Sequence, residues 1–536
     1  MSRLFVPNRF CATGSLLLRV NLTHKQPHSD TRCVFIQQQR PYVGGSKRDS
    51  FKYGSKSRIW ICGVGLGIAL AVGLKYHADR ANSSCDDKIV HSADRYREAI
   101  EVSRDLLERI KVGTETEVGA PGLVVGVSVD GVQVWCEGMG YADLENRVPC
   151  SPETVMRIAS ISKPLTSAAA ARLHEEGKLD LDIPVQQYVP EFPQKQFDGQ
   201  DVTITPRMLL SHLSGIRHYE KDAKKVKEDR EKAKRLLKPP VKEKEDEKSS
   251  SETKDKPSAT EQKGKGAAQA QKKKEFQQEE YYLKDNFESV THALDLFKDD
   301  PLIFRPGTTF LYSTHAFTLL SAVVERAAGQ HFLDLMMSMF RELGMLNTVP
   351  EENDPIIYHR SRFYHLNKRG RVVNCPYVDN SYKWAGGGFL STAGDLLLFG
   401  NALLYSYQVA HLKDTQGYLP GFLRPQTAID LWAPVDRTEA SWDKDGLYAQ
   451  GWLVVEKEQK YGQCRKRRHY VSHTGGAVGA SSVLLVLPDE EMRESIRPTP
   501  LLPQGVVVTI VANMQAVRLN STALKIAHEF DKSRGL

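Results

Sequence analysis

The stretch RIASISKPLTSAAAARL, Arg157–Leu173, places a serine three residues before a lysine at the start of an alanine-rich segment. On a helix, Ser160 and Lys163 would share one face and lie one turn apart. A lysine that is removed from water beside other cations has a lowered pKa and can take the proton of a serine hydroxyl. A helix N-terminus near Ser160 would stabilise the developing negative charge. The alternative interpretation is a capped helix that carries a surface lysine.

Two later stretches favour the catalytic interpretation, since a Ser-x-x-Lys pair alone is expected by chance about twice in a chain this long. In FLYSTHAFTLLSAVVE, Phe310–Glu325, Tyr312 stands two residues before Thr314 at the start of an apolar-periodic helix. In SHTGGAVGASSVLLVL, residues 472–487, the tetrapeptide His473-Thr474-Gly475-Gly476 begins a predicted strand. We expect this strand to line the edge of an active-site cleft.

These three elements, in this order, resemble the Ser-x-x-Lys, Tyr-x-Asn or Ser-x-Asn, and Lys-Thr-Gly motifs of the serine β-lactamase and penicillin-binding-protein superfamily. The resemblance is closest to the class C and D-alanyl-D-alanine carboxypeptidase branch, and within it to the animal mitochondrial serine β-lactamase-like proteins. It covers residues 92–220 and 281–536. Further stretches typical of the branch are GKLDLDIPVQQYVPEF (177–192), TPRMLLSHLSGI (205–216) and WAGGGFLSTAGDLLLFGNALL (384–404).

The resemblance implies a role for each matching residue. Ser160 would be the nucleophile and Lys163 the residue that activates it. Tyr312 would be a second base that passes the proton to the leaving amine. The residues that fix the substrate would be Thr314, His473, Thr474, Gly475 and Gly476. The backbone N–H groups of Ser160 and Gly476 would form an oxyanion hole, in which two fixed donors stabilise the tetrahedral intermediate.

Two positions differ from the family pattern. Thr314 stands where the family has Asn, so the amide that both donates and accepts a hydrogen bond is missing. His473 stands where the family has Lys. The positive charge that holds a substrate carboxylate would then depend on pH, given an ordinary histidine pKa near ~6.5. We therefore expect poor hydrolysis of penicillins.

The pattern of the folded part predicts an α+β domain. Residues 92–112 read as an amphipathic helix, and residues 122–143 read as a hairpin through Asp130-Gly131. Strands are expected in 470–488 and 505–514, and a closing helix in 521–533. We expect a β-lactamase/transpeptidase-like antiparallel sheet, flanked by helices and completed by both ends of the chain, beside a helix-rich subdomain.

The N-terminal segment indicates targeting. Residues 1–58 carry eleven Lys or Arg and two Asp or Glu, whereas the whole chain has a net charge of +7. This composition predicts a mitochondrial presequence, with a disordered basic tail as the alternative. Because the rest of the chain is close to neutral, composition does not favour nucleic acid as a partner.

The uncharged run Ile59–Leu74 would span ~24 Å as a helix, which is short of a ~30 Å hydrocarbon core. It is therefore a marginal membrane span. A basic presequence followed by a short apolar run is also the layout of a signal for the mitochondrial intermembrane space. We expect the chain there, with contact to the inner membrane.

Residues 222–278 are mixed in charge, almost free of aromatics and interrupted by Pro239-Pro240. They predict a disordered insertion within a hydrolase domain at 92–536, although the part up to Leu237 has the alternative of a solvated helix.

The eight cysteines have irregular spacing, which indicates reduced thiols. His212 and His218 fit loop or supporting roles, and no His or Cys spacing predicts a metal. No cofactor is expected.

The function implied by the resemblance is that of a mitochondrial serine peptidase, which forms an acyl-enzyme on Ser160 and acts on a peptide or protein substrate. The same resemblance implies a part in the regulation of lipid metabolism and self-association into filaments. One alternative is an esterase on the same fold. The other is a catalytically weak scaffold whose role is assembly.

Overall fold

The computed structural model describes residues 95–114, 117–237, 279–440, 443, 446–459, 466–489 and 502–534. All of them belong to one unit, Asn82–Leu536. The predicted presequence 1–58 and the apolar segment 59–74 lie outside the described residues. No helix among the residues that the structure describes is long and apolar enough to cross a membrane.

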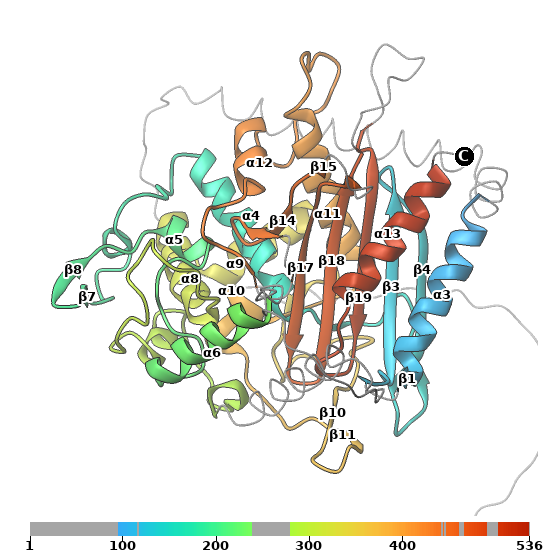
Figure 1. The fold of residues 1–536 in the computed structure, drawn as a ribbon, viewed down its shortest axis with the longest axis horizontal. Coiled ribbons are helices and arrows are strands. Elements are labelled where there is room, and N and C mark those ends of the chain that lie inside the picture. The colour runs from blue at the N-terminus through green and yellow to red at the C-terminus, as the bar shows by residue number, and fades with distance from the viewer. Residues whose placement is uncertain are drawn as a thin grey trace, which may run out of the picture. The chain divides into compact units, whose positions relative to one another are not determined.

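An eight-stranded antiparallel sheet runs through the domain in the order β13-β14-β17-β18-β19-β3-β4-β5 (Figure 1). Its strands are Leu447–Tyr448, Leu453–Val455, Tyr470–Ala477, Ala480–Pro488, Gly505–Ala512, Gly122–Val129, Val132–Asp143 and Val148–Pro149 in that order. β19 near the C-terminus pairs along its length with β3 near the beginning of the domain. The prediction of an antiparallel sheet completed by both ends of the chain is therefore confirmed.

The hairpin between β3 and β4 turns at the predicted dipeptide. Asp130 and Gly131 have φ angles of +51° and +78°. Two consecutive positive φ angles belong to the type I′ turn, whose twist matches that of the flanking strands. The turn thus sets the register that pairs Val129 with Val132.

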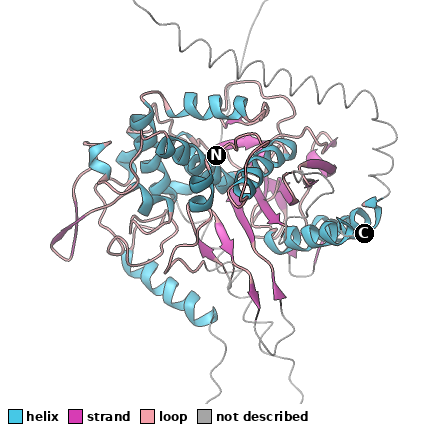
Figure 2. Ribbon diagram, turned by 90° about the horizontal axis from the view of Figure 1, so that it is seen from above, coloured by secondary structure: helices cyan, strands magenta, loops and turns pink. Residues whose placement is uncertain are grey.

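Alternating side chains of the sheet enter two separate hydrophobic cores. On one face, α3 (Arg97–Val112) and α13 (Asn520–Arg534) pack together and cover β3 and β19, as Figure 1 shows. On the other face, α11 (Ala393–Val409) packs against β3, β18 and β19. Figure 2 shows the strands between the two layers of helices. The helices expected at 92–112 and 521–533 form over Arg97–Val112 and Asn520–Arg534, so both predictions are confirmed for the described residues.

The helix-rich subdomain lies beside β17 and holds the motif-bearing helices (Figure 1). Its helices are α4 (Ser162–Glu175), α5 (Pro206–Leu210), α6 (Ala223–Leu237), α8 (Thr314–Ala328), α9 (Phe332–Glu342), α10 (Trp384–Gly387) and α12 (Pro425–Leu431). Short 3₁₀ turns are η1 (Ala159–Ile161), η2 (Val185–Gln187), η3 (Glu279–Tyr282), η4 (His292–Leu296) and η5 (Ser381–Lys383). The core between them contains the apolar faces of α4, α8, α9 and α11.

Small sheets and hairpins complete the connections. A three-stranded sheet has the order β6 (Met156–Arg157), β12 (Phe389–Ser391) and β9 (Val349–Pro350). Two-stranded pairs are Gly113–Thr114 with Glu117–Val118, Lys195–Phe197 with Gln200–Val202, Tyr364–Leu366 with Val372–Asn374, and Glu458–Gln459 with Lys466–Arg467. Because β6 ends three residues before Ser160, its pairing with β12 holds the entry to the serine turn.

The charged segment needs one correction. A helix, α6, occupies Ala223–Leu237, so the expectation of disorder from residue 222 is wrong for this part. The solvated helix up to Leu237, which was the alternative, is what forms. Its residues are mainly Lys, Arg, Glu and Ala, which are good helix formers. Residues 238–278 lie outside the described part of the chain.

Candidate active site

Ser160 lies in the tight turn η1, immediately before α4. The preceding residue, Ala159, has a φ of +49°, a left-handed conformation that costs roughly 1–3 kcal/mol outside glycine. Strand β17 packs directly on this turn. A β-carbon at Gly475 would lie 2.4 Å from the Ile158 carbonyl oxygen and 3.0 Å from Ala159 Cβ. Only glycine fits at position 475, and this brings the β17 backbone up to Ser160.

Lys163 is fully buried in the first turn of α4. Its Nζ lies 3.1 Å from Ser160 Oγ and 3.4 Å from Thr314 Oγ1, and it donates to the Gly386 carbonyl oxygen at 2.6 Å. Burial, followed by the charge of Lys383, lowers the pKa of Lys163 well below its usual value. A neutral amine within hydrogen-bond distance of the serine can accept its proton.

Tyr312 comes from the residue pair that precedes α8. Its hydroxyl hydrogen-bonds with the Ser160 side chain, and its ring lies 4.7 Å from the Lys163 Nζ. Burial raises the pKa of Tyr312 above its usual value, so the phenol keeps its proton and is available as a donor. The structure thus brings Ser160 and Lys163 together with Tyr312 and Thr314 from two separate parts of the sequence.

The glycine run 386–388 lies against the same side chains. A β-carbon at Gly386 would lie 2.7 Å from Thr314 Cγ2. The backbone therefore approaches Thr314 closely at this glycine. This close approach is what allows the Gly386 carbonyl to reach the Lys163 amine.

His473 is buried, with 3% of its surface exposed. Its Nδ1 lies 2.7 Å from the Thr474 carbonyl oxygen and its Nε2 lies 2.8 Å from the Tyr448 hydroxyl. The carbonyl accepts the Nδ1 proton, so Nε2 accepts from Tyr448. Burial, together with the charge of Lys163, lowers the pKa of His473 to about 3. The expected pH-dependent positive charge at position 473 is therefore wrong, because the ring stays neutral across the physiological range.

Two remaining substrate-binding candidates of β17, Thr474 and Gly476, are accessible to solvent. Thr474 is half-buried and Gly476 is exposed, and a β-carbon at Gly476 would meet no atom within 4 Å. His473–Ala477 pair only with β18, because β14 pairs with Tyr470–Ser472. Among the described residues, this half of the strand is therefore open on the side away from β18.

Two histidines contact Tyr312 and the backbone that follows it. His212 is fully buried and its ring lies 4.4 Å from that of Tyr312. Its Nδ1 accepts from the Ser313 backbone N–H at 3.2 Å, and His218 Nδ1 accepts from the Thr314 N–H at 3.2 Å. The predicted supporting role of both histidines is confirmed.

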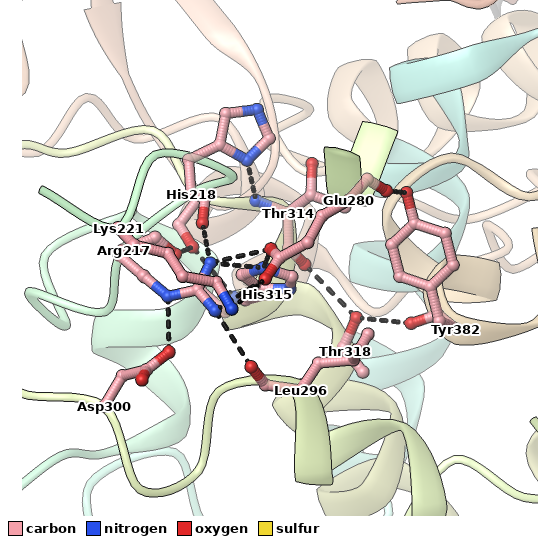
Figure 3. A network of polar contacts seen from close by, with 12 residues as sticks. Arg217, His218, Lys221, Glu280, Leu296, Asp300, Thr314, His315, Thr318 and Tyr382 are labelled. Carbon is pink, nitrogen blue, oxygen red and sulfur yellow. Dashed lines mark hydrogen bonds and ion pairs between the residues drawn. The ribbon is translucent and has the colours of Figure 1, made fainter. Parts of the chain in front are cut away.

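A buried ion pair lies one layer further out (Figure 3). The Arg217 guanidinium donates to both carboxylate oxygens of Glu280, at 2.7 and 3.0 Å, and His315 Nε2 lies 3.0 Å from the same carboxylate. The Arg217 carbonyl accepts from Ser313 Oγ at 2.6 Å, and Ser313 caps α8. The network therefore fixes the backbone that carries Tyr312 and Thr314.

Three contributors were missed by sequence reasoning: Tyr448, Glu280 and Lys383. Tyr448 and Glu280 sit in stretches without a motif. Lys383 directly precedes the typical stretch 384–404, and its position beside a glycine-rich motif was the one signal available.

A metal site, a disulfide and a separate cavity are the other kinds of site to consider among the described residues. Among the described residues no group of three or more His, Cys, Asp or Glu could hold a metal ion. The described cysteines, Cys136, Cys150 and Cys375, are free thiols. A cavity of about 250 Å³ is lined by Tyr407, Gln408, His411, Lys457, His469, Pro488 and Asp489, none of which surrounds Ser160.

The chain matches known proteins over most of its length. A family model described as Beta-lactamase covers residues 105–527. "Serine beta-lactamase-like protein LACTB, mitochondrial" of Homo sapiens is 59% identical over 447 residues, which are 82% of this chain and 81% of that protein. The Mus musculus protein of the same name is 58% identical over 457 residues, 83% of this chain and 82% of that protein. This similarity places the chain in the mitochondrion. A more distant relative, "Esterase EstB" of Burkholderia gladioli, is 27% identical over 236 residues, 43% of this chain and 48% of that protein.

Solved structures share the fold at low identity. A D-stereospecific amidohydrolase from Streptomyces has a TM-score of 0.53 at 18% identity and covers 79% of this chain and 98% of its own. EstCE1, a hydrolase with promiscuous acyltransferase activity, has a TM-score of 0.54 at 20% identity and covers 82% and 99%. The predicted β-lactamase/transpeptidase-like fold is confirmed by this likeness and by the family match.

Proposed function

The chain belongs to the beta-lactamase family, and on that premise we propose that it is a mitochondrial serine peptidase that forms an acyl-enzyme on Ser160. The single observation that carries this proposal is the contact of the Ser160 hydroxyl with a buried lysine whose pKa is lowered. Lys163 Nζ lies 3.1 Å from Ser160 Oγ. A structural lysine on a helix surface would extend into water instead.

Acylation follows from the positions of three side chains. The neutral Lys163 amine takes the Ser160 proton as Oγ attacks the substrate carbonyl. The backbone N–H groups of Ser160 and Gly476 stabilise the oxyanion. As the carbonyl carbon–nitrogen bond breaks, Tyr312 donates its proton to the leaving nitrogen and is reprotonated from the Lys163 ammonium. Water then attacks the ester, and the same groups return the enzyme to its starting protonation state.

The substrate-binding side of the site favours peptides over penicillins. His473 is neutral and bonded to Tyr448, so it offers no charge to a β-lactam carboxylate. Thr314 offers a hydroxyl near Lys163 in place of an amide. The exposed edge of β17 at Thr474 and Gly476 can instead pair with an extended peptide backbone.

An esterase is the second candidate, and the similarity to Esterase EstB favours it. The acylation chemistry would be the same, but an alkoxide leaving group depends less on protonation by Tyr312. The third candidate, an assembly scaffold of weak activity, rests on resemblance alone. So do the proposed roles in lipid metabolism and filament formation, the location in the intermembrane space and the contact with the inner membrane.

The test compares amide and ester substrates that share one acyl group, together with a diverse peptide library, on the full chain and on Ser160→Ala. Cleavage of amides that disappears in the variant supports a peptidase. Hydrolysis of esters alone would select the esterase. A folded protein that cleaves neither and sediments as large assemblies would select the scaffold, whereas a strictly monomeric protein at high concentration would remove the scaffold's basis.

A further inference from the structure

Lys383 is a buried cation surrounded by tyrosine rings. It is the last residue of η5, and 4% of its surface is exposed. Its Nζ lies 4.9 Å from the ring centre of Tyr382, 5.3 Å from that of Tyr281 and 5.8 Å from that of Tyr219. Aromatic faces at these distances attract a cation without neutralising it.

Within the described part of the chain, the side-chain amine of Lys383 makes no hydrogen bond or ion pair, although its backbone N–H donates to the Asn380 carbonyl. The acid whose charge acts on it, Glu351, is already occupied. One Glu351 carboxylate oxygen accepts from Arg157 at 2.6 Å and the other from Asn380 at 2.7 Å. An ammonium group that is removed from water without a carboxylate partner is costly, and such groups concentrate at functional sites.

The side chain of Lys383 runs beside the serine turn. A β-carbon at Gly387 would lie 3.8 Å from the Ala159 carbonyl carbon and 3.9 Å from Lys383 Cδ. The charge of Lys383 also acts on Lys163 and on His218, which are both parts of the site. The stem of Lys383 therefore lies close to the turn that carries Ser160, and its charge reaches the site residues Lys163 and His218.

The tyrosine rings are themselves held in place. The Tyr382 hydroxyl donates to the Glu280 carbonyl oxygen at 2.8 Å, and Thr318 of α8 donates to the Tyr382 carbonyl at 2.9 Å (Figure 3). Tyr281 follows Glu280, whose side chain pairs with Arg217. The cage is therefore preorganised before any ligand arrives, which limits the entropy lost on binding.

We propose that Lys383 binds an anionic group of the substrate, a carboxylate side chain near the scissile bond, and so determines specificity. This inference rests on the proposed function of Ser160. Lys383 would supply the positive charge for a substrate carboxylate that residue 473 lacks, because His473 is neutral and hydrogen-bonded to Tyr448. An incoming carboxylate would supply the hydrogen-bonded partner that the lysine lacks, as a charge-assisted hydrogen bond.

The charge of Lys383 also predicts a pH dependence. Burial, followed by the charge of Arg157, lowers the pKa of Lys383 to about 7, with Glu351 acting in the opposite direction. The groups that face it from neighbouring elements are Arg157, Glu351, Lys163, His218, Tyr219, Tyr281 and Tyr382. The ammonium form is complete below about pH 6 and is lost above pH 8, so the preference for an anionic substrate should decrease as pH rises.

The experiment compares two peptide substrates that differ only by aspartate or asparagine beside the scissile bond. The full chain is compared with Lys383→Met, and with Lys368→Met as a matched control, because Lys368 is exposed in the turn between β10 (Tyr364–Leu366) and β11 (Val372–Asn374). Because Lys383 also helps to lower the pKa of Lys163, its loss should affect both peptides to some extent. We expect Lys383→Met to lose roughly 10- to 100-fold more in kcat/KM on the aspartate peptide than on the asparagine peptide. The control variant Lys368→Met should leave kcat/KM on both peptides unchanged. An equal loss on both peptides, or no loss on either, would overturn the proposal.

A binding measurement separates this inference from the proposed function. In the Ser160→Ala background, calorimetry of the two peptides reports recognition without turnover. Tighter binding of the aspartate peptide that disappears on adding Lys383→Met supports the anion site even if the wild type cleaves neither peptide. Equal affinities in both backgrounds would reject the anion site even if Ser160 proves catalytic.

Discussion

Replacing Glu280 by glutamine tests the buried network behind Tyr312. Burial opposes ionisation of Glu280, but the hydrogen bonds from His315 and Arg217 outweigh it and lower the pKa to about 2. Each pKa unit corresponds to ~1.4 kcal/mol, so a decrease from an ordinary value near ~4.3 gives about 3 kcal/mol of stability at neutral pH. This agrees with the ~3–5 kcal/mol expected when one partner of a buried ion pair is removed. The half-exposed Asp300 still pairs with Arg217 at 2.5 Å, which favours the lower end.

The sign of the pH dependence follows from the direction of the shift. The folded pKa of Glu280 lies below the unfolded value, so its contribution is complete above about pH 4.5 and is lost as pH falls toward 2. Urea unfolding followed by tryptophan fluorescence should show Glu280→Gln to be less stable than wild type at pH 7, with the gap closing near pH 3. The matched control is Glu191→Gln, whose surface pair with Arg326 is 41% and 52% exposed and should change stability by less than ~1 kcal/mol. A loss for Glu280→Gln below ~1 kcal/mol at pH 7, or an equal loss at both pH values, would refute this reasoning.

Further predictions concern the site itself. Gly475→Ala should push β17 away from the serine turn and reduce the rate of Ser160 acylation by more than ~10-fold, since a 1 Å displacement can cost ~100-fold. Gly476→Ala has open space and should retain wild-type stability by thermal unfolding. Tyr448→Phe leaves His473 Nε2 buried without a donor and should lower the free energy of unfolding by ~1–3 kcal/mol in the same urea assay. Lys163→Arg keeps its charge at every pH and should abolish acylation. The wild-type acylation rate should rise with pH through the lowered pKa of Lys163 and reach its plateau well below pH 10.5. An active arginine variant would contradict a lysine base.

Local patterns predicted the elements whose geometry depends on nearby residues. The turn at Asp130-Gly131 was predictable because both central residues need positive φ angles, which glycine adopts readily and most other residues do not. The start of α8 follows from Ser313, which caps the helix through its side chain. The joining of Ser160, Lys163, Tyr312 and the β17 motif was predicted from resemblance, because spacing along the chain does not show which segments meet.

The missed residues depend on contacts between distant segments. Tyr448 on β13 gains its role from a hydrogen bond to His473 on β17. Burial of His473 is what removes its charge. Glu280 follows a long charged stretch, so nothing in the sequence distinguishes it from the other acidic residues there. Only folding brings its carboxylate to Arg217. The pKa of a side chain depends on the solvent and charges that surround it, so the state of His473 and Lys383 could not be read from residue type.

The most direct test of the central claim is intact mass spectrometry of the full chain after reaction with an activated acyl ester or a fluorophosphonate, followed by peptide mapping. We predict one adduct, on Ser160, that forms at a rate dependent on Lys163 and is absent from Ser160→Ala. A folded wild-type chain that forms no adduct, or that carries it on another residue, would contradict a nucleophilic serine at this site.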